Sequence, residues 1–270
     1  MTAERPTGSP GAAPGRDRAG GLALSPEPGA APRGARWRAQ ARLEWRLLMT
    51  NGEQVLLTLI IPVAVLLAVT RLGLAGIDEA APGVMALAIL SSAFTATAIA
   101  TGFERRSGVL KFLGATPLGR SGLLVGKVAA TLAQIVLQLV LIAGVAAALG
   151  WGPASAHPLA LLALVVLATV ALGSWGFALA GLLRAEATLA VANGIFLLLL
   201  FAGGTVLPAD RLPAPIAAAV SLLPTAALGD GLRALLDPAV GTGLPLPGMA
   251  VLAGWAAAGI ALSVRTFRWE

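Results

Sequence analysis

The chain has 270 residues, of which 57% are hydrophobic and 12% are charged, and its mean hydropathy is +0.85. Soluble domains carry about 25% charged residues, so this composition is typical of a protein whose solvent is largely lipid. The sequence holds no cysteine and one histidine, which excludes disulfides, thiol chemistry and a metal site built from several histidines. The net charge of +6 hides an uneven distribution of cations along the chain.

The first 34 residues are rich in Pro, Gly, Ala and Arg and show no apolar periodicity. A segment of this composition cannot bury enough apolar surface to offset the entropy of ordering, so residues 1–34 are predicted to form a disordered tail. No apolar core follows the first charged residues, which argues against a signal peptide.

Residues 35–52 are predicted to form an amphipathic helix in the membrane interface. At 100° per residue, apolar side chains gather on one side of this helix and a stripe of arginines lies beside them. The apolar side comprises Trp37, Ala41, Trp45 and Leu48, and the stripe comprises Arg38, Arg42 and Arg46. Such helices are typical of the headgroup region. A solvated basic helix is the alternative, and the membrane span that follows at once disfavours it.

Six apolar segments follow within residues 53–270. They are 54–74, 83–103, 125–150, 158–183, 187–207 and 246–264. Each reaches or approaches the ~20 residues that a helix needs to cross the hydrocarbon core. The sequence therefore predicts an all-α integral membrane protein with six transmembrane helices.

The distribution of Lys and Arg predicts the orientation of these spans. With the N-terminus in the cytoplasm, 16 of the 19 cations lie on the inner side, and only Arg71, Arg211 and Arg233 lie outside. Cytoplasmic loops carry the excess of Lys and Arg in membrane proteins. Both termini are therefore predicted to be cytoplasmic.

No ionisable side chain lies deep inside the six segments. Ionisable groups at membrane depth mark proton relays and catalytic centres, so a proton-coupled transporter and most intramembrane enzymes are disfavoured. Uncharged polar side chains occur in the second and third segments: Ser91, Ser92, Thr95, Thr97, Gln134 and Gln138. Interhelical hydrogen bonding is the favoured interpretation of these residues, and a substrate path is the alternative.

The stretch SGLLVGKV at 121–128 is only superficially like a phosphate-binding loop. That motif needs Gly, four residues, and then Gly-Lys followed by Ser or Thr. Here Ser121 stands in place of the first Gly and Val128 in place of Ser or Thr. The chain is therefore not expected to bind ATP by this route, and an ATP-driven motor would be a separate polypeptide.

The densest internal charge lies between the second and third apolar segments. Residues 101–127 hold five cations and one anion. The apolar residues that can share one helix face here are Phe103, Val109, Leu110 and Leu113. Gly114 and Pro117 are expected to end this short helix. The positive-inside tendency alone explains the charge but not the apolar positions, which suit docking into a groove on a cytoplasmic partner.

This stretch resembles the coupling-helix loop of the ABC type-2 exporter permeases, whose form is Glu-Arg, a Leu-rich turn, Thr-Pro, a basic residue and Leu-Leu-x-Gly-Lys. The matching residues are Glu104-Arg105, Leu110, Leu113, Thr116-Pro117, Arg120, Leu123-Leu124 and Gly126-Lys127. A second match lies within 192–236, at Asn193, Phe196, Gly203-Gly204, Pro208, Leu212-Pro213, Leu223-Pro224 and Arg233. The resemblance covers about residues 35–270 and looks closest to the drug-resistance branch, such as daunorubicin-type permeases.

The resemblance implies a permease that pairs with a second, identical or related permease and with cytoplasmic ATPase subunits. Those subunits would bind ATP and magnesium, so no cofactor is expected on this chain. The 104–122 coupling loop would contact the ATPase through Glu104, Arg105, Arg106, Leu110, Lys111 and Leu113. In the outer segment 208–245, the helix within APIAAAVSLLP is expected to re-enter the membrane. The pathway or gate would involve Gln134, Gln138, Asn193, Gly203, Gly204, Pro208, Pro213 and Pro224.

The expected function is ATP-driven export of a hydrophobic or amphipathic substrate, such as a drug, a lipid or a lipid-linked glycan, across a bacterial cell membrane. Membrane lipids are expected partners and nucleic acids are not. Two alternatives stay open. One is a regulatory or structural membrane subunit without transport. The other is a membrane lipid-modifying enzyme, which the sparse candidates Asp230, Asp237 and His157 disfavour.

Overall fold

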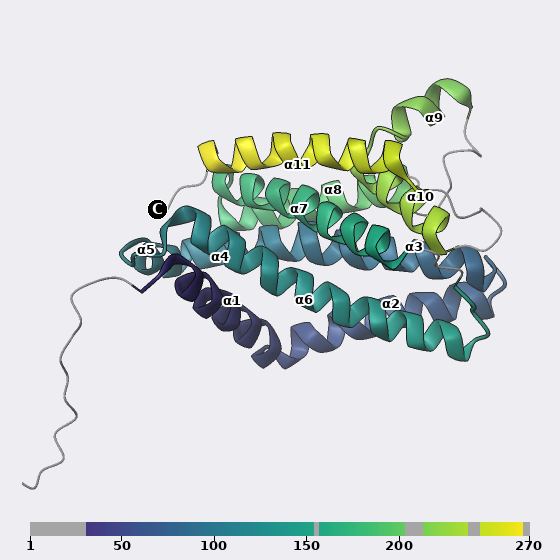
Figure 1. Cartoon of the computed structure of the whole chain (residues 1–270), viewed down its shortest axis with the longest axis horizontal. Helices are drawn as coiled ribbons and strands as arrows, with labels where there is room; N and C mark the ends of the chain where they lie inside the picture. Colours follow the sequence, from purple (N-terminus) through teal and green to yellow (C-terminus); the bar gives the residue numbers. More distant parts are fainter. Residues whose placement is uncertain (1–30, 154–156, 203–212, 237–243, 267–270) are drawn as a thin grey trace, which may run out of the picture. The chain divides into compact units, whose positions relative to one another are not determined.

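The computed structural model describes residues 31–153, 157–202, 213–236 and 244–266. These residues form helices and no strand. In chain order the elements are α1 (Arg33–Thr50), α2 (Gly52–Arg71), α3 (Ile77–Leu90), the π-helical turn η1 (Ser91–Ala96), α4 (Thr97–Arg106), α5 (Val109–Gly114), α6 (Gly119–Ala148), α7 (Pro158–Leu182), α8 (Ala185–Ala202), α9 (Ala214–Val220), α10 (Pro224–Leu236) and α11 (Leu246–Thr266). Figure 1 shows the long helices packed side by side.

Four helices of the described residues are long and apolar enough to cross a membrane. They are Ile77–Arg106 (which joins α3, η1 and α4), Ser121–Ala148, Pro158–Leu182 and Leu246–Thr266. Two shorter apolar helices, Thr58–Arg71 and Ala185–Phe201, occupy the first and fifth predicted segments. An all-α membrane protein is confirmed, and the count of six spans stays a prediction.

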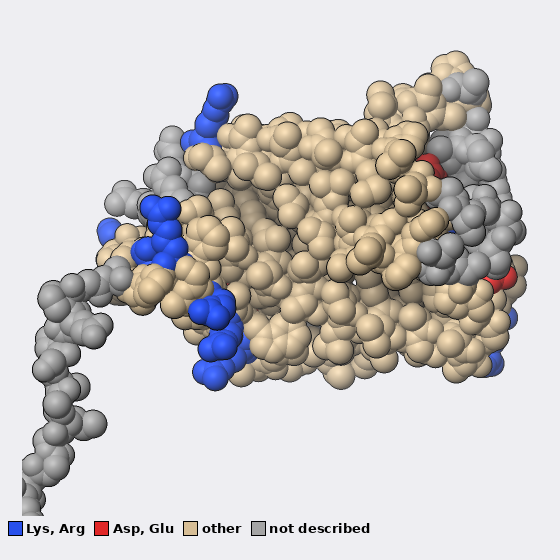
Figure 2. All heavy atoms as spheres, in the orientation of Figure 1, with Lys and Arg blue, Asp and Glu red and all other residues tan. Residues whose placement is uncertain are grey.

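Charged side chains gather at the two ends of the helices. Figure 2 shows a tan surface along the helices, with Lys and Arg mainly at the end where α1 begins, and Asp and Glu at the opposite end. An uncharged surface between two charged ends is what a helix bundle presents to the hydrocarbon core of a bilayer. The arrangement agrees with a multi-pass membrane protein.

Helix α1 matches the predicted amphipathic helix at 35–52 and packs along the first half of α6. The predicted arginine stripe is exposed and the predicted apolar side is half-buried. The most buried side chains of α1 are nonetheless two polar ones, Gln40 and Glu44. The interface between α1 and α6 is therefore partly polar, which the amphipathic pattern did not indicate.

The predicted re-entrant segment 208–245 is described only in part, and Gly203, Gly204 and Pro208 lie outside the described residues. Within this segment α9 is mostly exposed, and Ile216 has 52% of its surface accessible. Nearly all of α10 is buried, against α3, α7 and α11. The element that enters the bundle is thus α10, whereas the sequence indicated the α9 stretch. Pro213 precedes α9 and Pro224 begins α10, both at positions where proline's missing N–H costs no helical hydrogen bond.

Candidate functional site

The 104–122 loop folds into two short helical pieces. A single helix was expected over 103–113, but α4 continues from the bundle to Arg106 and α5 begins anew at Val109. Between them Gly108 has a φ of 78°, in the left-handed region that favours glycine. The chain therefore turns sharply at Gly108 and presents α5 at the end of the bundle (Figure 1).

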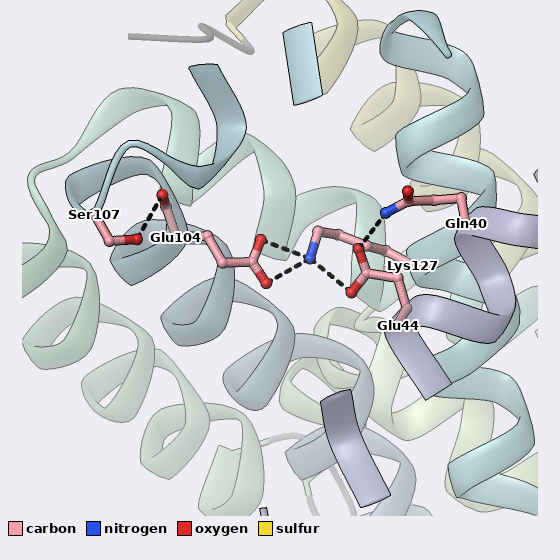
Figure 3. Close-up of polar contacts among 5 residues, drawn as sticks. All are labelled: Gln40, Glu44, Glu104, Ser107 and Lys127. Carbon is pink, nitrogen blue, oxygen red and sulfur yellow. Dashed lines mark hydrogen bonds and ion pairs between the residues drawn. The ribbon is translucent and has the colours of Figure 1, made fainter. Parts of the chain in front are cut away.

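Lys127 of α6 lies between two carboxylates, as Figure 3 shows. Its Nζ is 2.7 Å from Oε1 of Glu104 in α4 and 3.1 Å from Oε2 of Glu44 in α1. The Lys127 and Glu44 side chains are 7% and 9% exposed. Gln40 Nε2 donates to the remaining oxygen of Glu44 at 2.7 Å. Because a buried charge needs partners on all sides, these contacts hold α1, α4 and α6 in one arrangement.

Two glycines let α1 approach α6 closely. A Cβ placed on Gly126 would lie 2.5 Å from Cγ of Gln40, and one on Gly122 would lie 2.9 Å from Nε1 of Trp37. Small residues four apart on a membrane helix allow such close backbone approach. The Leu-Leu-x-Gly-Lys motif thus has a structural explanation, because Gly126 admits α1 and Lys127 then reaches Glu44.

The two arginines that follow Glu104 contact the junction of α7 and α8. Arg105 Nη1 donates to the carbonyl of Gly181 at 2.9 Å, and Nη2 donates to the carbonyl of Leu183. These carbonyls lie at the end of α7, where the last turn lacks backbone donors and the helix dipole is negative. Arg106 forms an exposed ion pair with Glu186.

Helix α5 has one buried and one exposed side. Leu110 is 1% exposed and contacts Leu123 of α6, and Leu113 packs partly buried against this pair. Phe112 is 80% exposed, and Val109 and Lys111 are also exposed. Leu110 was predicted to contact a partner, but in this fold its side chain fills the interior of the loop, so its contact with an ATPase stays a prediction. Phe112, which the sequence interpretation overlooked, is the exposed apolar residue.

Of the other residues predicted to contact the ATPase, Glu104, Arg105 and Arg106 have partners within the chain. Lys111 is exposed and Leu113 is half-buried. Glu44 was not singled out from the sequence, and Lys127 appeared only as part of a motif. Each is a charged residue on a helix that is otherwise rich in apolar residues, but no sequence pattern links the two, which lie 83 residues apart.

Gln138 of α6 joins two irregular helices by hydrogen bonds. Its Nε2 donates to the Thr58 carbonyl of α2 at 3.1 Å. That carbonyl would normally accept from the N–H of residue 62, which is a proline. The Gln138 side-chain oxygen accepts from Ser92 Oγ of η1 at 3.0 Å. Interhelical hydrogen bonding, the favoured interpretation of this glutamine, is confirmed. The Gln138 amide replaces the backbone donor that Pro62 lacks.

The two glutamines line different cavities. Gln134 lines one of about 140 Å³, together with the Lys127 cluster and Thr101. Gln138 lines another of about 380 Å³, beside Pro62 and Phe196. Asn193 is exposed on α8 and lines neither cavity. The predicted pathway residues therefore do not converge on a single cavity within the described part of the chain.

The chain matches the family model described as ABC-2 type transporter over residues 36–236. This range runs from α1 to the end of α10 and includes the Lys127 cluster, the 104–122 loop and Gln138. A search of curated proteins finds no match. Members of this family are membrane components whose ATPase activity resides on a separate subunit. The chain belongs to the ABC-2 type transporter family, and it is a multi-pass membrane permease of an ABC transporter.

Proposed function

We propose that this permease crosses a bacterial cell membrane six times, with both termini in the cytoplasm, and exports a hydrophobic or amphipathic substrate. Family membership and the four long apolar helices support a permease. The excess of Lys and Arg on one side of the predicted spans supports the orientation. The energy comes from ATP hydrolysis on the partner subunit.

The observation that carries this proposal is how the 104–122 loop is attached to the rest of the protein. Its base is tied to α1 and α6 by the Glu104–Lys127 contact, and to the end of α7 by Arg105. Its tip, α5, is held from inside by Leu110 and exposes Phe112. An ATPase that binds the exposed side and moves would therefore move α1, α4, α6 and the α7–α8 junction together.

The substrate path in this proposal runs beside the irregular parts of α2 and η1. Pro62 interrupts the hydrogen bonds of α2, and the π-helical turn at Ser91–Ala96 interrupts the α-helix opposite. Prolines and π-helical turns are both places at which helices kink, and π-helical turns are frequent at functional sites. The adjoining cavity is mainly apolar, and its polar lining residues are Thr58, Ser91 and Gln138. The exposed side of α8, which carries Asn193, faces a second permease in this arrangement.

The test is co-purification of the ATPase with the tagged permease. Phe112→Ser should release the ATPase, because it removes the exposed apolar contact of α5. Leu47→Ser is the matched control, because Leu47 is an exposed apolar residue, 54% accessible, on α1. Equal retention of the ATPase by both variants would place its binding surface elsewhere.

Transport is tested with the ATPase and the permease in proteoliposomes that hold a fluorescent amphipathic dye. Active complexes should move the dye in an ATP-dependent way, and Phe112→Ser should abolish this movement. Dye movement that continues when this chain is omitted from the complex would instead support a regulatory subunit.

A further inference from the structure

A polar cavity lies where α1 begins and the 104–122 loop leads into α6. It has a volume of about 310 Å³. From α1 it is lined by Arg33, Arg36 and Trp37, and from the loop and α6 by residues 117–119 and Ser121. The cavity is separate from the Lys127 cluster and from the exposed side of Phe112, so neither of those functions accounts for it.

The cavity has a strongly positive character. Two arginines line it, and none of the described acidic residues does. The Nε of Arg36 is buried and has no hydrogen-bond partner within the described residues. A buried donor without an acceptor is costly, and the planar guanidinium is suited to phosphate oxygens. The cavity therefore has the chemistry of a phosphate site.

An apolar groove adjoins this cavity. The groove has a volume of about 820 Å³ and lies between α6, α7 and α11. Ser121 lines both the cavity and the groove, so the two meet at this residue. The groove follows α6 from Ser121 to Leu132, roughly 16 Å at 1.5 Å per residue, which is about the depth of one leaflet. Figure 2 shows a hollow between α11 and α6 near the basic end.

We propose that the cavity and the groove together bind one anionic phospholipid of the leaflet beside α5. The phosphate lies on Arg33 and Arg36, and an acyl chain lies in the groove along Val125, Phe177 and Ile260. The adjoining groove argues for a lipid over free phosphate or an acidic peptide, since neither of these would cover it. Because the described lining residues are basic and include no carboxylate, they suit an anionic headgroup better than a zwitterionic one, whose cation would find no partner among them.

Such a lipid would contact both α1 and the start of α6. It would therefore hold the first turns of α1 against the 104–122 loop, next to the contacts that α1 makes with Gly122 and Gly126. This makes the attachment of the loop dependent on the lipid composition of the membrane. The inference needs a membrane-embedded chain but does not depend on transport or on an ATPase, so it fails or stands separately from the proposed function.

Native mass spectrometry of the purified full chain tests the headgroup part. Phosphatidylglycerol and phosphatidylcholine are added at equal concentration, and the retained lipids are counted. We expect one phosphatidylglycerol retained preferentially by the wild type, and roughly tenfold weaker retention by Arg33→Gln/Arg36→Gln. Arg38→Gln/Arg42→Gln removes the same charge from exposed positions of α1 that do not line the cavity. This control should keep the preference.

Equal loss by the two arginine pairs would overturn the proposal, because it would mean that α1 attracts anionic lipid without a site. Full displacement of the lipid by excess inorganic phosphate would overturn it in favour of a free-phosphate site. The groove is tested separately with Ala129→Phe, which fills it, and with Ala133→Phe, an exposed position of α6 outside it. Only Ala129→Phe should weaken retention of phosphatidylglycerol, and unchanged retention would remove the groove from the site.

Discussion

The Nζ of Lys127 lies 2.7 Å from Oε1 of Glu104, although 23 residues separate them in the sequence. This contact closes the base of the 104–122 loop, because Glu104 is near the end of α4 and Lys127 is in the third turn of α6. Glu44 contacts the same ammonium group from α1. The loop expected to transmit force is thus fastened to two other helices by a charge cluster inside the protein.

Lys127→Met should destabilise the protein strongly. It leaves Glu44 and Glu104 close together with no counter-charge, and breaking a buried pair in this way costs about 3 kcal/mol or more. Thermal unfolding in detergent measures the effect. Lys111→Met is the control, because Lys111 is exposed on α5 and its loss should change stability by no more than about 0.5 kcal/mol.

A triple variant separates the charge from the shape of the cluster. Adding Glu44→Gln and Glu104→Gln to Lys127→Met removes every charge of the cluster, and most of the lost stability should return. If the triple variant is less stable than Lys127→Met alone, charge imbalance is not the reason for the loss.

Gly126→Val should push α1 away from α6. The new Cβ would overlap Cγ of Gln40, at 2.5 Å, and would press on the backbone N of Ala41, at 3.3 Å. Overpacking of this kind costs about 1–3 kcal/mol. Because the chain has no cysteine, spin labels placed at Arg38 and Val125 can report the separation of α1 and α6, which should increase. Gly144→Val on the same helix has free space around its Cβ and should leave the separation unchanged.

The effects of Gln138→Leu and Pro62→Ala should depend on each other. Gln138→Leu alone leaves the Thr58 carbonyl without the donor now 3.1 Å away, at a cost of about 1–3 kcal/mol. Pro62→Ala restores the backbone N–H that this carbonyl would accept within α2. Gln138→Leu should therefore lower the free energy of unfolding by about 1 kcal/mol less in the Pro62→Ala background than in the wild type. A double-mutant cycle measures this difference. Additive effects would mean that Gln138 does not compensate for the proline.

Leu110→Ala should destabilise the loop and Phe112→Ala should not, although both shorten an apolar side chain of α5. Leu110 is 1% exposed and packs inside the loop, so Leu110→Ala should lower the free energy of local unfolding of the loop by about 2 kcal/mol. Phe112 is 80% exposed, so its loss should change stability by at most about 0.5 kcal/mol. Limited proteolysis of the loop measures this, because cleavage follows local opening. Faster cleavage of Phe112→Ala than of Leu110→Ala would contradict the assigned orientation of α5.

Local properties of the sequence determined the positions of the apolar helices and of the charged residues at their ends. Apolar runs of membrane length predict helices because backbone groups in lipid must pair within their own segment. The Glu-Arg and Gly-Lys motifs identified the family because they are contiguous patterns. The helix end predicted near Gly114 and Pro117 agrees with the end of α5 at Gly114. The additional turn at Gly108 was not predicted, because the presence of a glycine does not reveal whether its φ is positive or negative.

Only the tertiary structure decided which residues meet. Helical periodicity tells which side chains share one face of a helix, but not which helix lies against that face. Glu104 was therefore expected to pair with an ATPase, while its nearest cation, Lys127, lies on α6. Leu110 was expected at the surface, and Gln138 could not be linked to Thr58 from sequence. In each case the partner lies on another helix, and contacts between helices follow from how the helices pack.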